Sequence, residues 1–243
     1  MPASFSELVP QPTPTPTRLD LYTPIHKALR AWMFDTVTAL GRVDGLDDEV
    51  TEQALARVSA LLDVCRGHIL HEQTHMHPPV REAARLDSLE ADTDHEHHAH
   101  VMGTLVSMVQ AVRASQGDDR FRTLTRLYRQ LALFVAENLT HMHLEETEHN
   151  GWLWSRFSDV ELGAIHDTLV GSIPPKEMAD ILRWMLPSLS PRERLEMLCD
   201  MRGKMPPGAF EGVLQLAQQV LPVHDWAALC RQLDITVCLP EAA

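Results

Sequence analysis

The sequence contains few cysteines and few aromatic residues for its length. Four cysteines lie scattered along 243 residues, at Cys65, Cys199, Cys230 and Cys238, and no two of them form a CxxC pair. This spacing argues against a zinc ribbon or a disulfide scaffold and fits a reducing compartment, so we expect a cytoplasmic protein. Aromatic residues make up 5 % of the chain, there are 11 glycines, and Leu, Ala, Met and Glu are plentiful, which favours helix.

Excess positive charge and long apolar runs are also missing. The formal net charge is −13 with histidine neutral, so binding to nucleic acid has no electrostatic support. No run of about 18 apolar residues is present, which predicts no membrane span. The first ten residues, MPASFSELVP, have neither a basic nor an apolar region, and we expect no signal peptide.

Histidine is the abundant exception, with 14 residues, most of which lie in the tracts 68–77, 95–100 and 141–149. Two of these tracts contain a His and a Glu four residues apart, His68 with Glu72 and His141 with Glu145. On an α-helix this spacing stacks the two side chains on one face, one turn apart. Two such pairs on two helices could hold a dimetal site with bridging carboxylates.

Proline and glycine positions divide the first part of the chain into four expected helices. Residues 1–19 contain three prolines that alternate with threonine, which predicts an extended leader. We expect the second helix to stop before Pro78-Pro79, because the residue preceding a proline avoids the helical region. Gly151 should close the fourth helix. The expected helices cover about 24–41, 48–75, 80–115 (or from Asp87) and 118–148.

The apolar stripe of each expected helix continues into a candidate ligand near one end. Short loops make neighbouring helices antiparallel, so these ends should meet at one end of an up-and-down antiparallel four-helix bundle. Buried imidazoles and carboxylates would each cost several kcal/mol without partners, and a metal ion would resolve that cost. The candidate ligands are His26, His68, Glu72, Asp94 or His95, His98, His141 and Glu145.

Seven other histidines fall off the stripes or one turn beyond them. We expect them to form a polar rim around the site. The donor set lacks thiolates, which disfavours a structural zinc site, and His with carboxylate in a helical bundle is the pattern of non-haem di-iron proteins. Manganese or zinc could occupy the same ligands. The rim histidines are His71, His75, His77, His97, His100, His143 and His149.

These motifs resemble the hemerythrin-like, or HHE cation-binding, family over about residues 20–152. The resemblance is carried by His26, by His68-x3-Glu72 followed by Pro78, by the region of His95 and His98, and by His141-x3-Glu145. It implies a di-iron centre of two iron ions in which Glu72 and Glu145 bridge. It also implies binding or sensing of oxygen, nitric oxide, peroxide or iron. The third helix lacks a His-x3-His pair, so whether His95, His98 or both bind stays open.

The rest of the chain is expected to be a small helical appendage. Prolines interrupt it repeatedly and leave short helical patterns at about 159–171, 176–186, 191–202, 208–220 and 224–233. The sequence thus predicts an all-α protein with a leader at 1–19, a bundle at 20–153 and a C-terminal helical region at 154–243. That last region could bind a protein partner or form a dimer.

Three functions remain open at this stage. The first is a di-iron protein that binds or senses a small diatomic ligand or peroxide. The second is an enzyme that uses the same ligands, either a di-iron oxidase or oxygenase or one that consumes peroxide or nitric oxide. The third is a non-redox metal-binding or scaffolding protein. We expect a binding or sensing metalloprotein rather than an enzyme, and no membrane or nucleic-acid partner.

Overall fold

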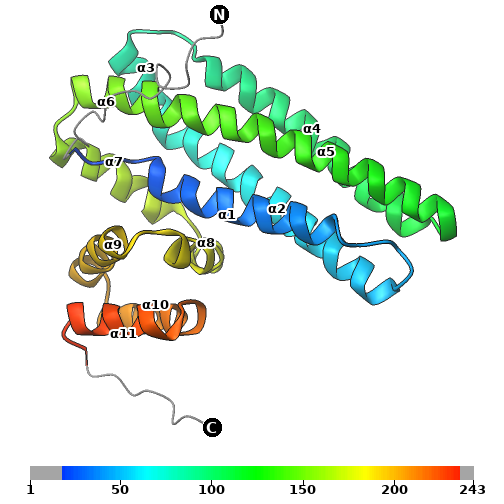
Figure 1. Cartoon of the computed structure of the whole chain (residues 1–243). Helices are drawn as coiled ribbons and strands as arrows, with labels where there is room; N and C mark the ends of the chain where they lie inside the picture. The colour runs from blue at the N-terminus through cyan, green and yellow to red at the C-terminus, as the bar shows by residue number, and fades with distance from the viewer. Residues whose placement is uncertain (1–17, 236–243) are drawn as a thin grey trace, which may run out of the picture.

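The computed structural model describes residues 18–235, which form helices joined by short loops and contain no strand (Figure 1). The prediction of an all-α protein is confirmed for this part of the chain. Most of the expected leader and Cys238 lie outside the described residues. None of the described helices is both long enough and apolar enough to cross a membrane.

Four long helices lie alongside one another and enclose the main hydrophobic core (Figure 1). They are α1 (Thr23–Leu40), α2 (Asp48–His71), α4 (Glu90–Ala114) and α5 (Gly117–Leu144). Helix α1 packs against α2 and α5, and α4 packs against the same two helices. The core between them is built from fully buried aliphatic and aromatic side chains, among them Met33, Leu61, Leu105, Leu127, Leu131 and Phe134.

Short polar side chains set where these helices begin. Asp47 accepts hydrogen bonds from the backbone N–H groups of Glu49 and Val50 and so caps α2. Asp92 reaches back in the same way to the N–H of Leu89, directly before α4. These caps satisfy backbone donors that the first turn of a helix leaves without partners.

The second and fourth helices continue past the points where we expected them to stop. Helix α2 runs through a π-helical turn, η2 (Glu72–Met76), into α3 (His77–Ala84). Helix α5 runs through η3 (Glu145–His149) into α6 (Asn150–Arg156), so Gly151 does not end it. The prediction at Pro78-Pro79 was wrong because the π-turn moves both prolines into the first turn of α3, where a missing N–H costs nothing.

The C-terminal helices begin at regular intervals. From Asp159 to Pro175, and from each helix start to the next, the step is 16 residues. A Ser or a Pro precedes each start, and both residue types favour helix initiation. The last four helices enclose a core of their own around Leu198 and Cys230. The five helices are α7 (Asp159–Ser172), α8 (Pro175–Ser188), α9 (Pro191–Lys204), α10 (Pro207–Val220) and α11 (Val223–Gln232).

Helix α8 lies against α1, close to the end that carries the candidate ligands (Figure 1). The rings of Trp32 and Trp184 stack with centroids 5.2 Å apart. Close by, the Lys27 ammonium donates to Glu193 at 2.6 Å. The imidazole of His71 lies 3.0 Å from the Glu177 carboxylate. The C-terminal region is therefore held to the helices of the site by both apolar and charged contacts.

Candidate metal centre

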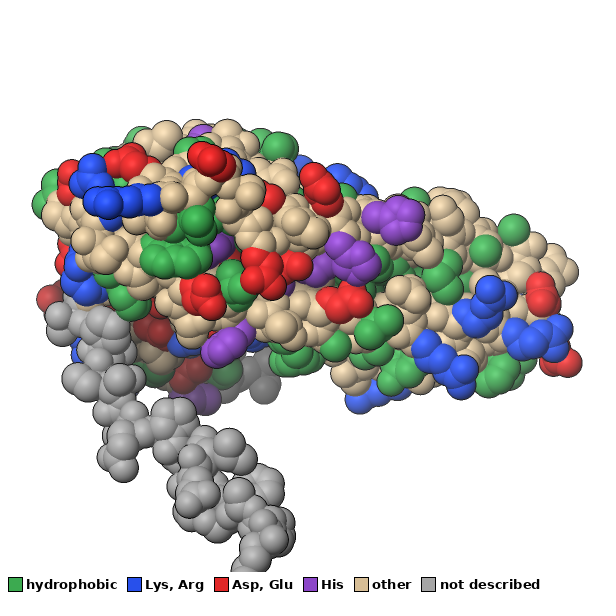
Figure 2. Space-filling model, turned by 90° about the horizontal axis from the view of Figure 1, so that it is seen from above, with side chains coloured by type: hydrophobic (Ala, Val, Ile, Leu, Met, Phe, Trp, Pro, Cys, Tyr) green, Lys and Arg blue, Asp and Glu red, His purple; other side chains and the backbone are tan. Residues whose placement is uncertain are grey.

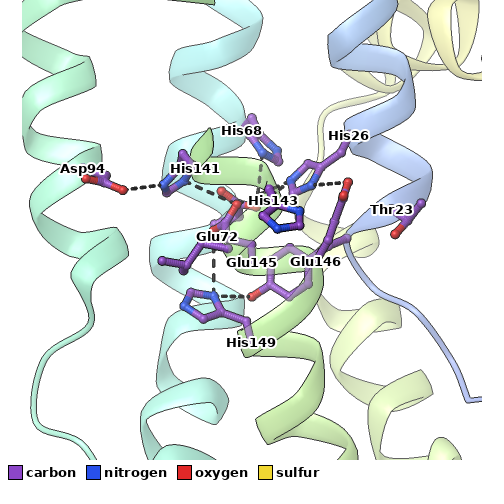
Figure 3. Close-up of polar contacts among 12 residues, drawn as sticks. Thr23, His26, His68, Glu72, Asp94, His141, His143, Glu145, Glu146 and His149 are labelled. Atoms are coloured by element: carbon purple, nitrogen blue, oxygen red, sulfur yellow. Dashed lines mark hydrogen bonds and ion pairs between the residues drawn. The ribbon is translucent and has the colours of Figure 1, made fainter. Parts of the chain in front are cut away.

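The candidate ligands come from the ends of four helices that meet in one buried place. His26 lies in the first turn of α1, and His68 lies in the last turn of α2, one turn before Glu72. His141 and Glu145 hold the same relation at the end of α5. Figure 3 shows these side chains pointing toward one another between the helices. Together with His95 of α4, the structure brings six of the seven candidate ligands together.

The first group of possible ligand atoms belongs to His26, His68 and Glu72, and all lie within 4.8 Å of one another. His68 Nε2 lies 3.1 Å from Glu72 Oε1, and His26 Nε2 lies 3.6 Å from the same oxygen. His26 Nε2 is also 3.5 Å from Glu145 Oε2. One ion placed among these atoms would have two imidazole nitrogens and carboxylate oxygens around it.

The second group consists of Glu72, His95, His141 and Glu145, all buried. His95 Nε2 and His141 Nε2 are 2.9 Å apart. His95 Nε2 lies 3.5 Å from Glu72 Oε2, and His141 Nε2 lies 3.3 Å from Glu145 Oε2. Glu72 therefore directs one oxygen to each group, and Glu145 Oε2 lies beside a histidine of each. Glu72 is therefore the carboxylate that the two groups share.

The spacing of these atoms matches the spacing of ligand atoms around one metal ion. Two nitrogens bound to one ion at about 2.1 Å lie roughly 3.0–3.4 Å apart for ligand angles between octahedral and tetrahedral. The observed separations fall close to that range. Both oxygens of Glu72 and of Glu145, and Nε2 of His26 and of His68, are buried without a hydrogen-bond partner. Such groups are costly to bury, so these buried His and Glu side chains could hold a metal ion.

The two carboxyl groups differ in the pKa that the site imposes. Burial raises the pKa of Glu145 well above its usual value, and the nearby charge of Glu72 raises it further. Burial acts on Glu72 in the same direction, but the electrostatic effect of the neighbouring histidines, first that of His68, holds its pKa well below the usual value. Without a metal, the pair therefore keeps one proton. A cation would take the place of that proton, as expected for metal-linked carboxylates.

Outer carboxylates orient two of the candidate imidazoles. His141 Nδ1 lies 3.1 Å from Asp94, and His26 Nδ1 lies 3.1 Å from Glu146, which Arg30 also binds (Figure 3). A carboxylate on Nδ1 leaves Nε2 free to face a metal, which is the usual arrangement around metal-bound histidine. Burial lowers the pKa of His141 to about 3, so its imidazole is neutral, as a ligand must be.

His98 is the seventh candidate, and it belongs to neither group. Its side chain is buried, its ring lies edge-on to His141 with centroids 5.2 Å apart, and it also contacts Phe134. His98 Nδ1 has no hydrogen-bond partner. Of the two histidines His95 and His98, either or both of which were expected to bind, His95 belongs to a group of possible ligand atoms, while His98 lies beside that group.

Two histidines of the expected polar rim are in fact buried beside the site. His77 is 0 % exposed and His149 is 1 % exposed. His77 directly follows η2 and His149 is the last residue of η3, and sequence periodicity did not predict either π-turn. A signal was present, because each lies four or five residues after a candidate bridging Glu. The remaining rim histidines are closer to the expectation, since His97, His100 and His143 are exposed and His71 and His75 are partly buried. Figure 2 shows histidine side chains at the surface among acidic ones.

Comparisons of the chain with protein-family models, with curated proteins and with solved structures find no match. The helices and the His/Glu cluster are compatible with a hemerythrin-like protein. That likeness depends on the motifs and on the geometry described above.

Proposed function

We propose that this chain is a hemerythrin-like protein in which α1, α2, α4 and α5 form an up-and-down four-helix bundle around two metal ions. Its function would be to bind or sense a small oxidant such as oxygen, nitric oxide or peroxide. The observation that carries the proposal is the pair of overlapping ligand groups that share Glu72. A carboxylate shared between two His-rich groups is what a dimetal centre requires.

Iron is the metal that this donor set favours. Imidazole and carboxylate ligands contributed by several helices of a bundle are typical of non-haem di-iron proteins. Manganese and zinc accept the same ligands, so metal analysis has to decide. A pair of iron ions would supply reversible binding of a small oxidant and the redox change that follows it. The chain would supply the ligands, hold their orientation through Asp94 and Glu146, and exclude bulk water.

The buried position of the groups favours a small ligand over an organic substrate. A surface cavity of about 410 Å³ lies between η2, α3 and α7, lined by Pro78, Phe157, Ile165 and their neighbours. None of the seven candidate ligands lines it. Beneath the candidate ligands, the core residues Leu29, Phe134 and Leu105 are at most 3 % exposed. This arrangement supports binding or sensing ahead of the alternative, a di-iron oxidase, oxygenase or peroxide-consuming enzyme.

Residues 154–243 are proposed to carry the response to ligand binding, through a protein partner or a dimer. The contacts between α1 and α8 support this role, because His26 and Trp32 belong to the same helix. A shift of α1 on ligand binding would change the packing of Trp32 against Trp184.

The first experiment is metal analysis of the purified full-length protein, together with its absorption spectrum under oxygen. We expect two iron ions per chain and the near-ultraviolet bands of an oxo-bridged di-iron centre. Glu72→Gln removes a charged oxygen from both groups and should lower the metal content to one ion or none. Glu148→Gln, an exposed position in η3, is the matched control and should keep both ions. A wild-type chain that holds no metal after iron loading would refute the proposal.

A further inference from the structure

His77 is buried, which is unusual for a residue that lies five positions after Glu72 on a helix. In a regular α-helix, five residues turn the chain by about 500°, which would place His77 about 140° away from the face of Glu72. The π-turn changes this, because the N–H of His77 bonds to the C=O of Glu72, five residues earlier. His77 thus returns to the inner face of the helix. Such π-turns occur often at functional sites.

One ring nitrogen of His77 is anchored and the other is free. Nδ1 donates a hydrogen bond to Asp92 at 2.7 Å, and Arg81 binds the same carboxylate oxygen. With the proton on Nδ1, Nε2 of the neutral ring carries a lone pair. This Nε2 atom is buried and has no hydrogen-bond partner. A buried acceptor without a donor is costly, so a bound group that carries a proton is the expected partner.

The orientation of His77 shows what kind of partner it faces. Its ring stacks on the ring of His95 with centroids 4.9 Å apart and planes inclined by 15°. Two nearly parallel rings cannot direct their in-plane lone pairs at one point. His77 therefore does not share an ion with His95, and it belongs to neither group of possible ligand atoms. Its free Nε2 is therefore available to a different partner.

Other polar aromatic side chains lie beside His77. His149 lies edge-on to His77, with ring centroids 6.1 Å apart and planes at 85°. The hydroxyl of Tyr22, itself 1 % exposed, lies 3.3 Å from His149 Nδ1. His149 in turn stacks on Trp152. His77, His149 and Tyr22 thus form a buried polar cluster beside Glu145, called the compartment below, whose side chains can donate or accept hydrogen bonds.

We propose that this compartment is a binding site for a small protonated oxygen ligand of the size of hydrogen peroxide, and that His77 Nε2 accepts the hydrogen bond from its O–H. The inference rests on the proposed function, because the ligand would lie beside the metal-binding groups. A ligand without a proton, such as the azide anion, has nothing to donate to Nε2. The site therefore distinguishes protonated from unprotonated ligands of similar size.

Two substitutions of His77 test the roles of its two ring nitrogens separately. Asn reaches about as far as Nδ1, so His77→Asn keeps the bond to Asp92 and removes the acceptor. Gln reaches about as far as Nε2, so His77→Gln keeps an acceptor there. The exposed His100 on α4 provides the control, His100→Asn. All four proteins are loaded with iron, and their metal content is measured before each titration.

Ligand affinity is measured by absorption, with azide at equilibrium and with hydrogen peroxide from the initial amplitude after rapid mixing. We expect His77→Asn to weaken peroxide binding about tenfold, because a hydrogen bond to a buried acceptor is lost, and to change azide binding less than twofold. His77→Gln should retain most of the peroxide affinity, and His100→Asn should match the wild type. Metal content should stay at two ions in every variant.

The other outcomes separate this inference from the proposed function. If His77→Asn keeps two ions and binds peroxide as tightly as the wild type, the inference is wrong and the metal centre stands. If both His77 variants lose metal, His77 has a ligand or structural role instead, which also overturns the inference. If the wild-type protein itself holds no iron, the proposed function fails and this inference fails with it.

Discussion

Replacing Glu145 with Gln should have opposite effects on the metal-free and the metal-loaded protein. The Glu145 carboxyl is 0 % exposed, and neither of its oxygens has a hydrogen-bond partner. Burial, and then the charge of Glu72, raise its pKa well above the usual value of 4.5. In the metal-free protein Glu145 therefore keeps its proton at pH values where the unfolded chain has lost it.

The direction of the pKa shift determines how the free energy of unfolding changes with pH. A group whose pKa is raised by folding contributes stability that is fully present below the unfolded pKa and is lost as the pH rises. Each pH unit in that range removes about 1.4 kcal/mol from the free energy of unfolding. Between pH 4.5 and pH 7 the loss reaches an upper limit of about 3 kcal/mol if the folded carboxyl stays protonated throughout. Gln carries no proton to lose, so Glu145→Gln avoids this cost.

Urea unfolding of the chelator-treated proteins at several pH values measures the effect. The difference in unfolding free energy between Glu145→Gln and the wild type should be small at pH 4.5 and should grow in favour of the variant up to pH 7. Taking the difference cancels the titration of the other histidines and carboxylates to first order. Glu148→Gln, which changes an exposed carboxylate in the same π-turn, should show a difference that is flat with pH.

Bound metal should make the wild type more stable than Glu145→Gln, which reverses their order in the metal-free state. A ligand present at 100 times its dissociation constant adds about 2.7 kcal/mol to the free energy of unfolding. The wild type gains this at each ion, whereas a neutral amide cannot bridge two cations, so Glu145→Gln should hold one ion or none. The reasoning is refuted if the stability difference of the metal-free proteins does not change with pH, or if Glu145→Gln binds two ions as tightly as the wild type.

Three further experiments test separate parts of the structure. Asp94→Asn should lower metal affinity by about 10- to 100-fold in a competition with a chelator, because Asp94 orients His141 through Nδ1. Leu61→Ala opens a cavity at a fully buried position and should lower the free energy of unfolding by about 2–5 kcal/mol in urea, while the loaded protein keeps its metal content. The stacked pair Trp32 and Trp184 should show a coupling of about 0.5–1.5 kcal/mol in a double-mutant cycle to Ala, and no coupling would mean that α8 is held to α1 by other contacts.

The apolar stripes in the sequence were the main basis for predicting the helices and the meeting of their ends. His68 and Glu72 continue the row of Val58, Leu61 and Cys65, and the whole row is buried or partly buried in the structure. This prediction succeeded because a regular helix repeats every 3.6 residues. A residue at the end of a long apolar row therefore lies on the same buried face as the rest of the row. The same reasoning found the end of α5, where the row reaches the second His-x3-Glu pair.

Prediction failed where the backbone leaves the 3.6-residue repeat. His77 was assigned to a polar rim because five α-helical residues carry it off the face of Glu72, and the π-turn that returns it has no strong sequence signature. The choice between His95 and His98 depended on the rotation of α4 about its axis, which a mixed His-rich pattern does not define. The 16-residue spacing of α7 to α11 was present in the sequence, but the irregular positions of the prolines hid it.

The two π-turns occupy equivalent places in the two halves of the candidate centre. Each begins at the Glu of a His-x3-Glu pair, and each leads to a buried histidine, His77 directly after η2 and His149 at the end of η3. A π-turn gives up regular α-helical hydrogen bonding, so one occurrence could be an accident of local packing, whereas two at matching positions need a common cause. The common element is a second layer of buried imidazoles next to the carboxylates. His77 lies five residues after Glu72, so the π-turn is what returns it to the inner face. We therefore expect that deleting one residue from η2, such as Gln73, would leave the His68–Glu72 spacing intact and would replace the π-turn by a regular turn, because four α-helical residues bring His77 to within about 40° of the face of Glu72. Both metal ions and peroxide binding should then be retained, and loss of peroxide binding with both ions retained would show that the π-turn itself is needed to position His77.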